Sequence, residues 1–292
     1  MVGAFTSTQR EVTQDHSIRQ PLLEEIQKFR DGRMLISFFI SFRSQVPLGS
    51  EDADMIEEVL NNSDTSKGVT LLLDAPGGDG LAAERIIQLC KQYSQVDFET
   101  IVATRAKSAA TMVCLGSDKI LMGATSELGP IDPQIPLQIG DGWQWVSAYH
   151  VVKTYKDLMN NAIGLKDGNI EPFLQQLAQF NSTQIQMLES ASKLSESIAI
   201  ASLKRGMLKG LKEKEIKKKI ECFTNPEITL SHGRALNIEH LEETGLNIEE
   251  IDLKTGLWKA IRNLYTRTSY VVNRSDSGQK ILETVASSYH AG

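Results

Sequence analysis

The 292-residue chain has few cysteines, and none of them suggests a covalent or metal framework. Cys90, Cys114 and Cys222 each lie in an apolar or helical context, and no two have the spacing of metal ligands. We therefore expect reduced thiols in or near the core, and we expect neither a disulfide scaffold nor a metal site. The low count favours a reducing compartment.

Excess positive charge and long apolar runs are also missing. The chain carries 31 Lys and Arg against 37 Asp and Glu, a net charge of −6, which argues against a nucleic-acid partner. The longest early apolar run, MLISFFISF, is about half the length of a membrane-spanning helix, and the first twenty residues lack the apolar core of a secretory signal. We expect a soluble cytoplasmic protein with no membrane span.

What the chain does contain is an alternation of strand-like and helix-like segments from about 33 to 125. GVTLLLDA is a continuous apolar run, typical of a strand buried on both faces of a parallel sheet. FETIVATRA and DKILMGA are also strand-like, and helical patterns follow the first two of these runs. This order predicts an α/β fold of stacked βαβ units, with 69–75, 99–104 and 119–123 in one mostly parallel sheet.

The domain organisation follows from where this alternation stops. Helical spacing dominates from Ser147 onward, which predicts a helical segment at 147–215 added to a core domain spanning 18–260. The polar residues 1–17 are expected to be mobile, and 261–292 to form a C-terminal extension that ends in one more helix.

The stretch VTLLLDAPGGDG raises a specific question, because a buried strand ends on two glycines, Gly77 and Gly78. Glycine adopts backbone angles that other residues resist, and it lets another group approach the main chain closely. Something must therefore come close to the backbone at this turn.

Three segments in order carry a family resemblance: DAPGGDGLAAERI, ATRAKSAATMVCLGSDKILM and TSELGPIDPQI. Together they resemble the Clp-protease/crotonase superfold, and most of all the serine dehydrogenase proteinase family, whose relatives include signal peptide peptidase A and the Clp proteolytic subunit. The resemblance covers about 34–140 and resumes at 224–252 with SHGRALNIEHLEETGLNIEEI. It implies a cofactor-free serine-type peptidase that acts on peptides or unfolded proteins and assembles as a homo-oligomer.

The resemblance also implies roles for particular residues. Ser108 would be the nucleophile, and the backbone N–H groups of Gly77 or Gly78 and of Ala109 would form the oxyanion hole. A serine at a helix start also has a structural explanation, because serine is a common N-cap. The chain departs from its relatives at Ala110, where they often have glycine, and an alanine there could crowd the backbone.

The general base is left open by the sequence. His232 is the leading candidate, and Asp132, near the position of the Clp histidine, is either a partner in catalysis or a loop aspartate between prolines. Lys153 and Lys156 are read as solvated, because they lie away from the apolar stripe of their helix, and Lys107 faces away if it ends a strand. Glu127 and the pair Trp143 and Trp145 either shape a substrate surface or serve packing and oligomer contacts.

Two other functions compete with the peptidase. A crotonase-type acyl-CoA enzyme would use the same paired N–H groups without a serine nucleophile, although no CoA-directed signature is present. A catalytically silent oligomeric scaffold would explain Ala110 and the lack of an obvious base. Covalent labelling of Ser108 by a fluorophosphonate separates the first function from the other two.

Overall fold

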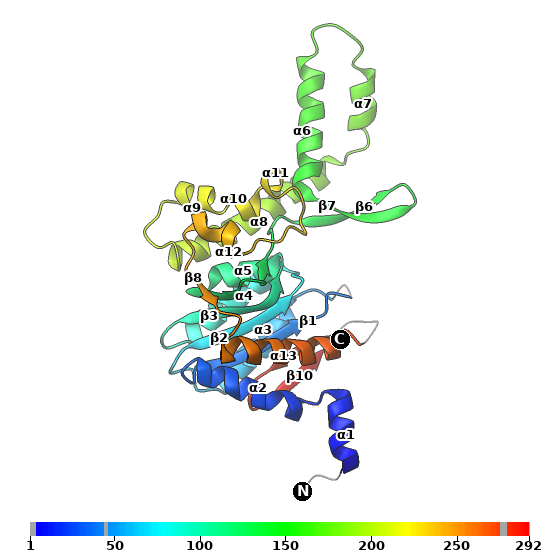
Figure 1. Ribbon diagram of the computed structural model, residues 1–292. Coiled ribbons are helices and arrows are strands. Elements are labelled where there is room, and N and C mark those ends of the chain that lie inside the picture. Colours follow the sequence, from blue (N-terminus) through cyan, green and yellow to red (C-terminus); the bar gives the residue numbers. More distant parts are fainter. Residues whose placement is uncertain (1–3, 44–45, 275–278, 292) are drawn as a thin grey trace.

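The computed structural model describes residues 4–43, 46–274 and 279–291. Its centre is an eight-stranded sheet in the order β10–β9–β1–β2–β3–β4–β8, with β5 paired to β3, and a separate two-stranded hairpin joins β6 to β7 (Figure 1). The strands are β1 (Met34–Ile40), β2 (Val69–Ala75), β3 (Phe98–Ala106), β4 (Lys119–Gly123), β5 (Glu127–Leu128), β6 (Gln134–Ile139), β7 (Gly142–Ser147), β8 (Ile248–Ile251), β9 (Lys280–Glu283) and β10 (Ser288–Ala291).

Helices connect these strands and build the outer layers. They are α1 (Ala4–Thr13), α2 (His16–Phe29), α3 (Ser50–Asn61), α4 (Gly80–Tyr93), α5 (Ala109–Gly116), α6 (Ala148–Gly164), α7 (Glu171–Leu177), α8 (Ser182–Arg205), α9 (Glu213–Lys219), α10 (Glu221–Thr224), α11 (Pro226–Thr229), α12 (Ile238–Leu241), the 3₁₀ turn η1 (Glu242–Thr244) and α13 (Gly256–Val272).

The predicted parallel sheet is confirmed. β1, β2, β3, β4 and β8 all run parallel, with Val69 of β2 opposite Phe98 of β3 and Glu99 of β3 opposite Lys119 of β4. Every residue of β1 and of β2 is buried, as a strand covered by helices on both faces requires. The α/β fold class expected from the sequence is therefore the observed one.

The two faces of the sheet are covered by different helices. Leu35 and Phe39 of β1 pack on one face with α2 and α13, whereas Ile36 and Phe38 pack on the other face with α3, α4, α5 and α8. Successive strand residues point to opposite faces, so an uninterrupted apolar run supplies both cores. The result is a three-layer arrangement with the sheet in the middle.

The helical segment predicted at 147–215 is present as α6 to α9. Before it comes the β6–β7 hairpin, which the sequence did not predict. The hairpin and the helices α6 and α7 form an arm that projects away from the sheet layers (Figure 1). The arm has a small core of its own in which Ala148, Val152, Ile185 and Leu188 are buried. α8 then returns to the body, where its residues Ile198, Ala199 and Leu203 join the main core.

The first and last described segments of the chain meet, since His16 and Arg19 of α2 contact Glu283 of β9. The helix α13 continues without a break through residue 260, where the sequence suggested the end of the core domain. β9 then extends the sheet by pairing antiparallel to β1, with Phe38 opposite Leu282. The final helix expected after 279 is wrong, since β9 and β10 form an antiparallel pair there. Residues 4–13 and 16–29 form α1 and α2; whether 1–17 moves stays a prediction.

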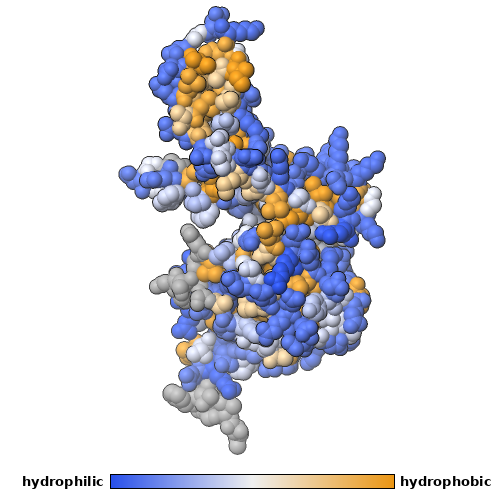
Figure 2. Space-filling model, turned by 180° about the vertical axis from the view of Figure 1, so that it is seen from behind, coloured by the Kyte–Doolittle hydropathy of each residue, from blue (hydrophilic) through white to orange (hydrophobic). Residues whose placement is uncertain are grey.

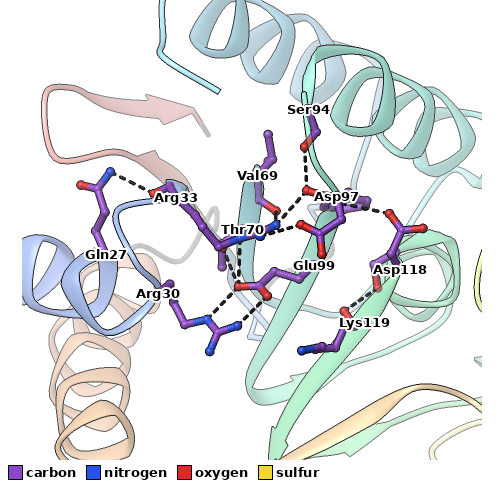
Figure 3. A network of polar contacts seen from close by, with 12 residues as sticks. Gln27, Arg30, Arg33, Val69, Thr70, Ser94, Asp97, Glu99, Asp118 and Lys119 are labelled. Atoms are coloured by element: carbon purple, nitrogen blue, oxygen red, sulfur yellow. Dashed lines mark hydrogen bonds and ion pairs between the residues drawn. The ribbon is translucent and has the colours of Figure 1, made fainter. Parts of the chain in front are cut away.

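A buried polar network holds the strand starts together, at the edge of the sheet opposite to the carboxyl ends of the strands (Figure 3). Arg30 of α2 donates to both oxygens of Glu99 on β3, at 2.8 and 2.7 Å, and Thr70 of β2 donates to the same carboxylate at 2.7 Å. Burial alone would raise the pKa of Glu99, but the Arg30 and Thr70 hydrogen bonds outweigh it and lower that pKa. The ionised network links α2, β2 and β3.

Candidate active site

The candidate site lies where β2 and β3 end, because both strands run parallel and finish at the same edge. β2 leads through Pro76 into the Gly77–Gly78 turn, and β3 leads through Lys107 into Ser108 at the start of α5. Pro76, the two glycines and Ser108 line a cavity of about 1010 Å³ that is also lined by Asp132 and His232. The structure thus gathers all the residues proposed from the sequence around one cavity.

Ser108 has an unusual backbone at the strand-to-helix junction. Its φ and ψ are 50° and −120°, which is uncommon for any residue other than glycine. Its hydroxyl makes no capping hydrogen bond to α5, so the capping explanation for this serine finds no support in the geometry. Strained residues of this kind cluster at active sites, and a sharp turn between strand and helix exposes a serine hydroxyl to the cavity.

The glycine turn is pressed closely against the serine. A Cβ added to Gly77 would lie 2.7 Å from the Lys107 carbonyl oxygen, 2.7 Å from Ser108 Cβ and 3.1 Å from the Ala109 nitrogen. One added to Gly78 would lie 2.3 Å from the Leu48 carbonyl oxygen. Both glycines have positive φ, of 107° and 153°. Only glycine fits here, and this answers the question that the sequence raised about the turn.

Main-chain donors at this junction remain available. The Leu48 N–H donates to Gly77 O, and the Asp79 N–H donates to Leu48 O, both at 2.8 Å, which braces the turn from outside. Within the described residues, no hydrogen bond uses the N–H groups of Gly77, Gly78 or Ala109. Unpaired N–H groups beside a serine hydroxyl are the chemistry of an oxyanion hole.

His232 and Asp132 form a hydrogen-bonded pair. His232 Nδ1 lies 2.7 Å from Asp132 Oδ1, and the exposed fractions of the two side chains are 25% and 4%. Burial alone would raise the pKa of Asp132, but the hydrogen bond and the charge of His232 outweigh it, so that the pKa lies below its ordinary value. An ionised carboxylate only accepts, so the ring nitrogen facing it, Nδ1, carries a proton, and Nε2 is the nitrogen that a base could use.

The acid and the histidine come in the opposite order to that of the Clp subunit. Asp132 follows β5 near the place where the resemblance puts a histidine, and His232 lies near the place where it puts the acid. The two residues are 100 positions apart, and nothing in the local patterns pairs them. A contact of this range becomes visible only once the chain is folded.

The three lysines lie as the sequence analysis expected. Lys153 pairs with Asp157 at 3.3 Å and Lys156 with Glu189 at 2.6 Å, with side chains 45% and 58% exposed. The Lys107 ammonium lies 2.8 Å from Glu127 Oε1 and donates to the carbonyl groups of two further residues. Ala110 is fully buried in the main core, where its N–H donates to Lys107 O at 2.9 Å.

The sequence reasoning missed several residues of the site. Gln134 Nε2 donates to Asp132 Oδ2 at 2.9 Å, so the carboxylate is held at both oxygens. Met112 of α5 and Leu194 of α8 also line the cavity, and so does Trp145 of β7, which the sequence had already suggested as part of a substrate surface. Gln134 could have been found from the sequence, because it is two residues from Asp132. The residues of α8 could not, because only tertiary packing brings them to the cavity.

With this geometry described, comparison with known proteins becomes informative. Residues 42–155 match the family of ClpP-like SDH-type serine proteinases. The match covers the Gly77–Gly78 turn, Ser108 and Asp132, and it confirms the resemblance and the fold class inferred from the sequence. The matched segment is thus similar to proteins of the serine-protease type. In the described part of the chain, no helix is long and apolar enough to cross a membrane.

Two curated relatives of the SDH-type segment are uncharacterized proteins of Methanocaldococcus jannaschii. They are 34% and 29% identical over 85 residues, which is 29% of this chain and 29% of each relative. The match thus spans under a third of the relatives' length. Among solved structures, a serine-to-alanine mutant of a membrane-bound stomatin-specific protease is 18% identical, with a TM-score of 0.31, over 48% of this chain and 68% of that one.

Proposed function

We propose that the chain is a serine peptidase that uses Ser108 as nucleophile, His232 as general base and Asp132 to orient the base. The observation that supports this most is the His232–Asp132 pair, in which a buried acceptor fixes one ring nitrogen and, among the described residues, leaves the other without a hydrogen bond. A neutral histidine suits a base at neutral pH, because its unperturbed pKa lies near 6.5. An ionised aspartate beside it serves orientation, as in other serine hydrolases.

The proposed reaction proceeds in two halves. Ser108 Oγ attacks the substrate carbonyl carbon while its proton passes to His232 Nε2, and the N–H groups of Ala109 and of Gly77 or Gly78 hold the developing oxyanion. His232 then gives the proton to the leaving amine as the C–N bond breaks, which leaves an acyl ester on Ser108. Water attacks this ester, loses its proton to His232, and frees the acid as Ser108 Oγ recovers a proton.

The decisive experiment is covalent labelling with a fluorophosphonate, followed by mass spectrometry of the labelled peptide. The wild-type protein should carry the label on Ser108, and Ser108→Ala should lose both the label and hydrolysis of an unfolded protein while it still folds. Ser195→Ala is the matched control, because Ser195 lines the same cavity from α8 and should leave labelling intact.

His232→Ala should slow hydrolysis by about a hundredfold or more, the usual scale for losing a general base. Full activity of Ser108→Ala would reject the peptidase function outright. Full activity of His232→Ala alone would place the base elsewhere, with Lys153, Lys156 or a neighbouring subunit as the next candidates.

The remaining expectations concern substrates and assembly. We expect peptides or unfolded proteins as substrates, no cofactor, a cytoplasmic location, and a homo-oligomer. Apolar side chains gather on the projecting arm (Figure 2), where Trp143, Ile163 and Met187 are 71%, 76% and 67% exposed. Exposed apolar surface of this kind is a candidate contact between subunits. A monomeric mass by light scattering at micromolar concentration would contradict the assembly.

A further inference from the structure

Lys107, the residue before Ser108, has an ammonium group with three fixed partners. Its Nζ lies 2.8 Å from Glu127 Oε1, 3.2 Å from Leu128 O and 3.3 Å from Arg234 O, and the side chain is only 12% exposed. An ammonium has three N–H donors and no acceptor, so these three acceptors satisfy it completely. These three contacts together hold the Lys107 ammonium in one place.

The partners of Lys107 belong to segments that build the site. The Lys107 main chain is part of the serine elbow, since its N–H donates to Ala75 O and its carbonyl accepts from Ala110 N–H. Its side chain reaches Arg234, two residues beyond His232. A single residue therefore ties the elbow that carries the nucleophile to the segment that carries the histidine.

We infer that Lys107 is a positioning residue, which holds the His232 segment at a fixed place relative to Ser108. The inference rests on the proposed function. The Glu127 carboxylate compensates the charge of the ammonium, so the ammonium can bind two neutral carbonyl groups in a largely buried place. The antiparallel bridge between Leu128 and Leu236 holds the far end of the same segment. Asp132 holds the His232 ring, and the Lys107 contact fixes the backbone at Arg234 between them.

Gly129 provides an independent way to disturb the same contact. A Cβ added there would lie 2.5 Å from Lys107 Cδ, so the absence of a side chain makes room for the lysine stem. Gly129→Ala should displace this stem while the charge, Glu127 and both carbonyl groups remain present. Two different substitutions should therefore produce the same functional defect.

The test compares Lys107→Met and Gly129→Ala with wild type in peptide hydrolysis and in the rate of fluorophosphonate labelling. We expect kcat and labelling to fall by about tenfold to a hundredfold, the scale of a misplacement of 1 Å or less, with KM unchanged. Lys119→Met is the matched control: Lys119 pairs with Glu249 at 2.9 Å with a side chain 32% exposed, but it starts β4, at the opposite edge of the sheet.

A second comparison separates positioning from a loss of folded structure. If Lys107 acts through His232, then Lys107→Met should have almost no further effect on labelling in a His232→Ala background, because residues that act as a unit are not additive. A general structural defect would reduce labelling by the same factor in both backgrounds. Should Lys107→Met fail to fold, Gly129→Ala carries the same cycle.

Each outcome is decisive. Wild-type kcat in Lys107→Met and Gly129→Ala would overturn the inference, and so would an undiminished effect in the His232→Ala background. Neither result touches the proposed function, which fails separately if the wild-type protein is neither labelled at Ser108 nor active.

Discussion

The glycine turn offers a quantitative test, through the pair Gly77→Ala and Gly210→Ala. Both glycines have a similar positive φ, 107° and 95°. A side chain in left-handed backbone costs roughly 1–2 kcal/mol, so both variants should lose this much free energy of unfolding. A Cβ at Gly210 meets nothing within 4 Å. Gly210→Ala therefore measures the backbone cost alone.

Gly77→Ala adds a steric conflict at the reacting centre. The new Cβ would lie 2.7 Å from Ser108 Cβ and from Lys107 O, where ordinary contacts begin at 3.4 Å. The turn and the serine elbow must separate by roughly 0.7 Å, and a misplacement of about 1 Å in a reacting geometry can cost about a hundredfold. Loss of one oxyanion donor costs about 10²–10³ in kcat. We therefore expect kcat to fall at least about a hundredfold.

The assay is hydrolysis of a fluorescently labelled unfolded protein, alongside urea unfolding of each variant. Gly210→Ala should show a lower unfolding midpoint with wild-type kcat, whereas Gly77→Ala should lose activity at temperatures where it remains folded. Equal kcat in the two variants would refute the reasoning, because it would mean that crowding at Ser108 and Ala109 has no effect on the reaction.

Three further predictions concern buried charges. Asp132→Asn should lower kcat by about 10⁴-fold with little change in KM, because His232 then loses the acceptor that selects its tautomer; steady-state kinetics near pH 7 would check this. Burial raises the pKa of Asp74 to about 7 from 3.8, so its contribution to stability is complete below pH 3.8 and is lost as pH rises through 7. In urea titrations, the free energy of unfolding of the wild type should fall with pH by up to about 1.4 kcal/mol per pH unit between these pH values. Asp74→Asn should show a flatter dependence. Lys280→Met should cost about 3–5 kcal/mol in thermal unfolding, since it leaves Asp52 buried and without its partner at 2.7 Å.

The sheet could be predicted because its signals are local. A strand covered on both faces needs a mostly apolar run, and β1, β2 and β4 have one. β9 was mistaken for helix because four residues are too few to show a period. The β6–β7 hairpin escaped notice because its strands project from the body and expose Trp143 and Trp145, so no buried face imposes a clear alternation.

The site could be predicted only in its local parts. The Gly77–Gly78 turn and Ser108 can each be recognised within a few residues, and the neighbouring motifs favoured a nucleophile over a cap. The backbone angles of Ser108 and its missing capping hydrogen bond, which a sequence does not contain, support the same interpretation. The Asp132–His232 pair depends on folding across 100 residues. The role of Lys107 was equally hidden, because its partners come from β5 and from the segment after α11.

The separation of the catalytic parts along the chain has a consequence for biosynthesis. The glycine turn and Ser108 are made first, and His232 follows only after the hairpin and helices α6 to α11. At bacterial-like elongation speeds, the interval is roughly 6–25 s. Closing a loop of this length also costs about 4 kcal/mol of chain entropy, which the packing of the intervening helices must offset. A nascent chain therefore displays the proposed nucleophile before the proposed base, and on this proposal it should stay inert toward its neighbours until the arm has emerged and folded.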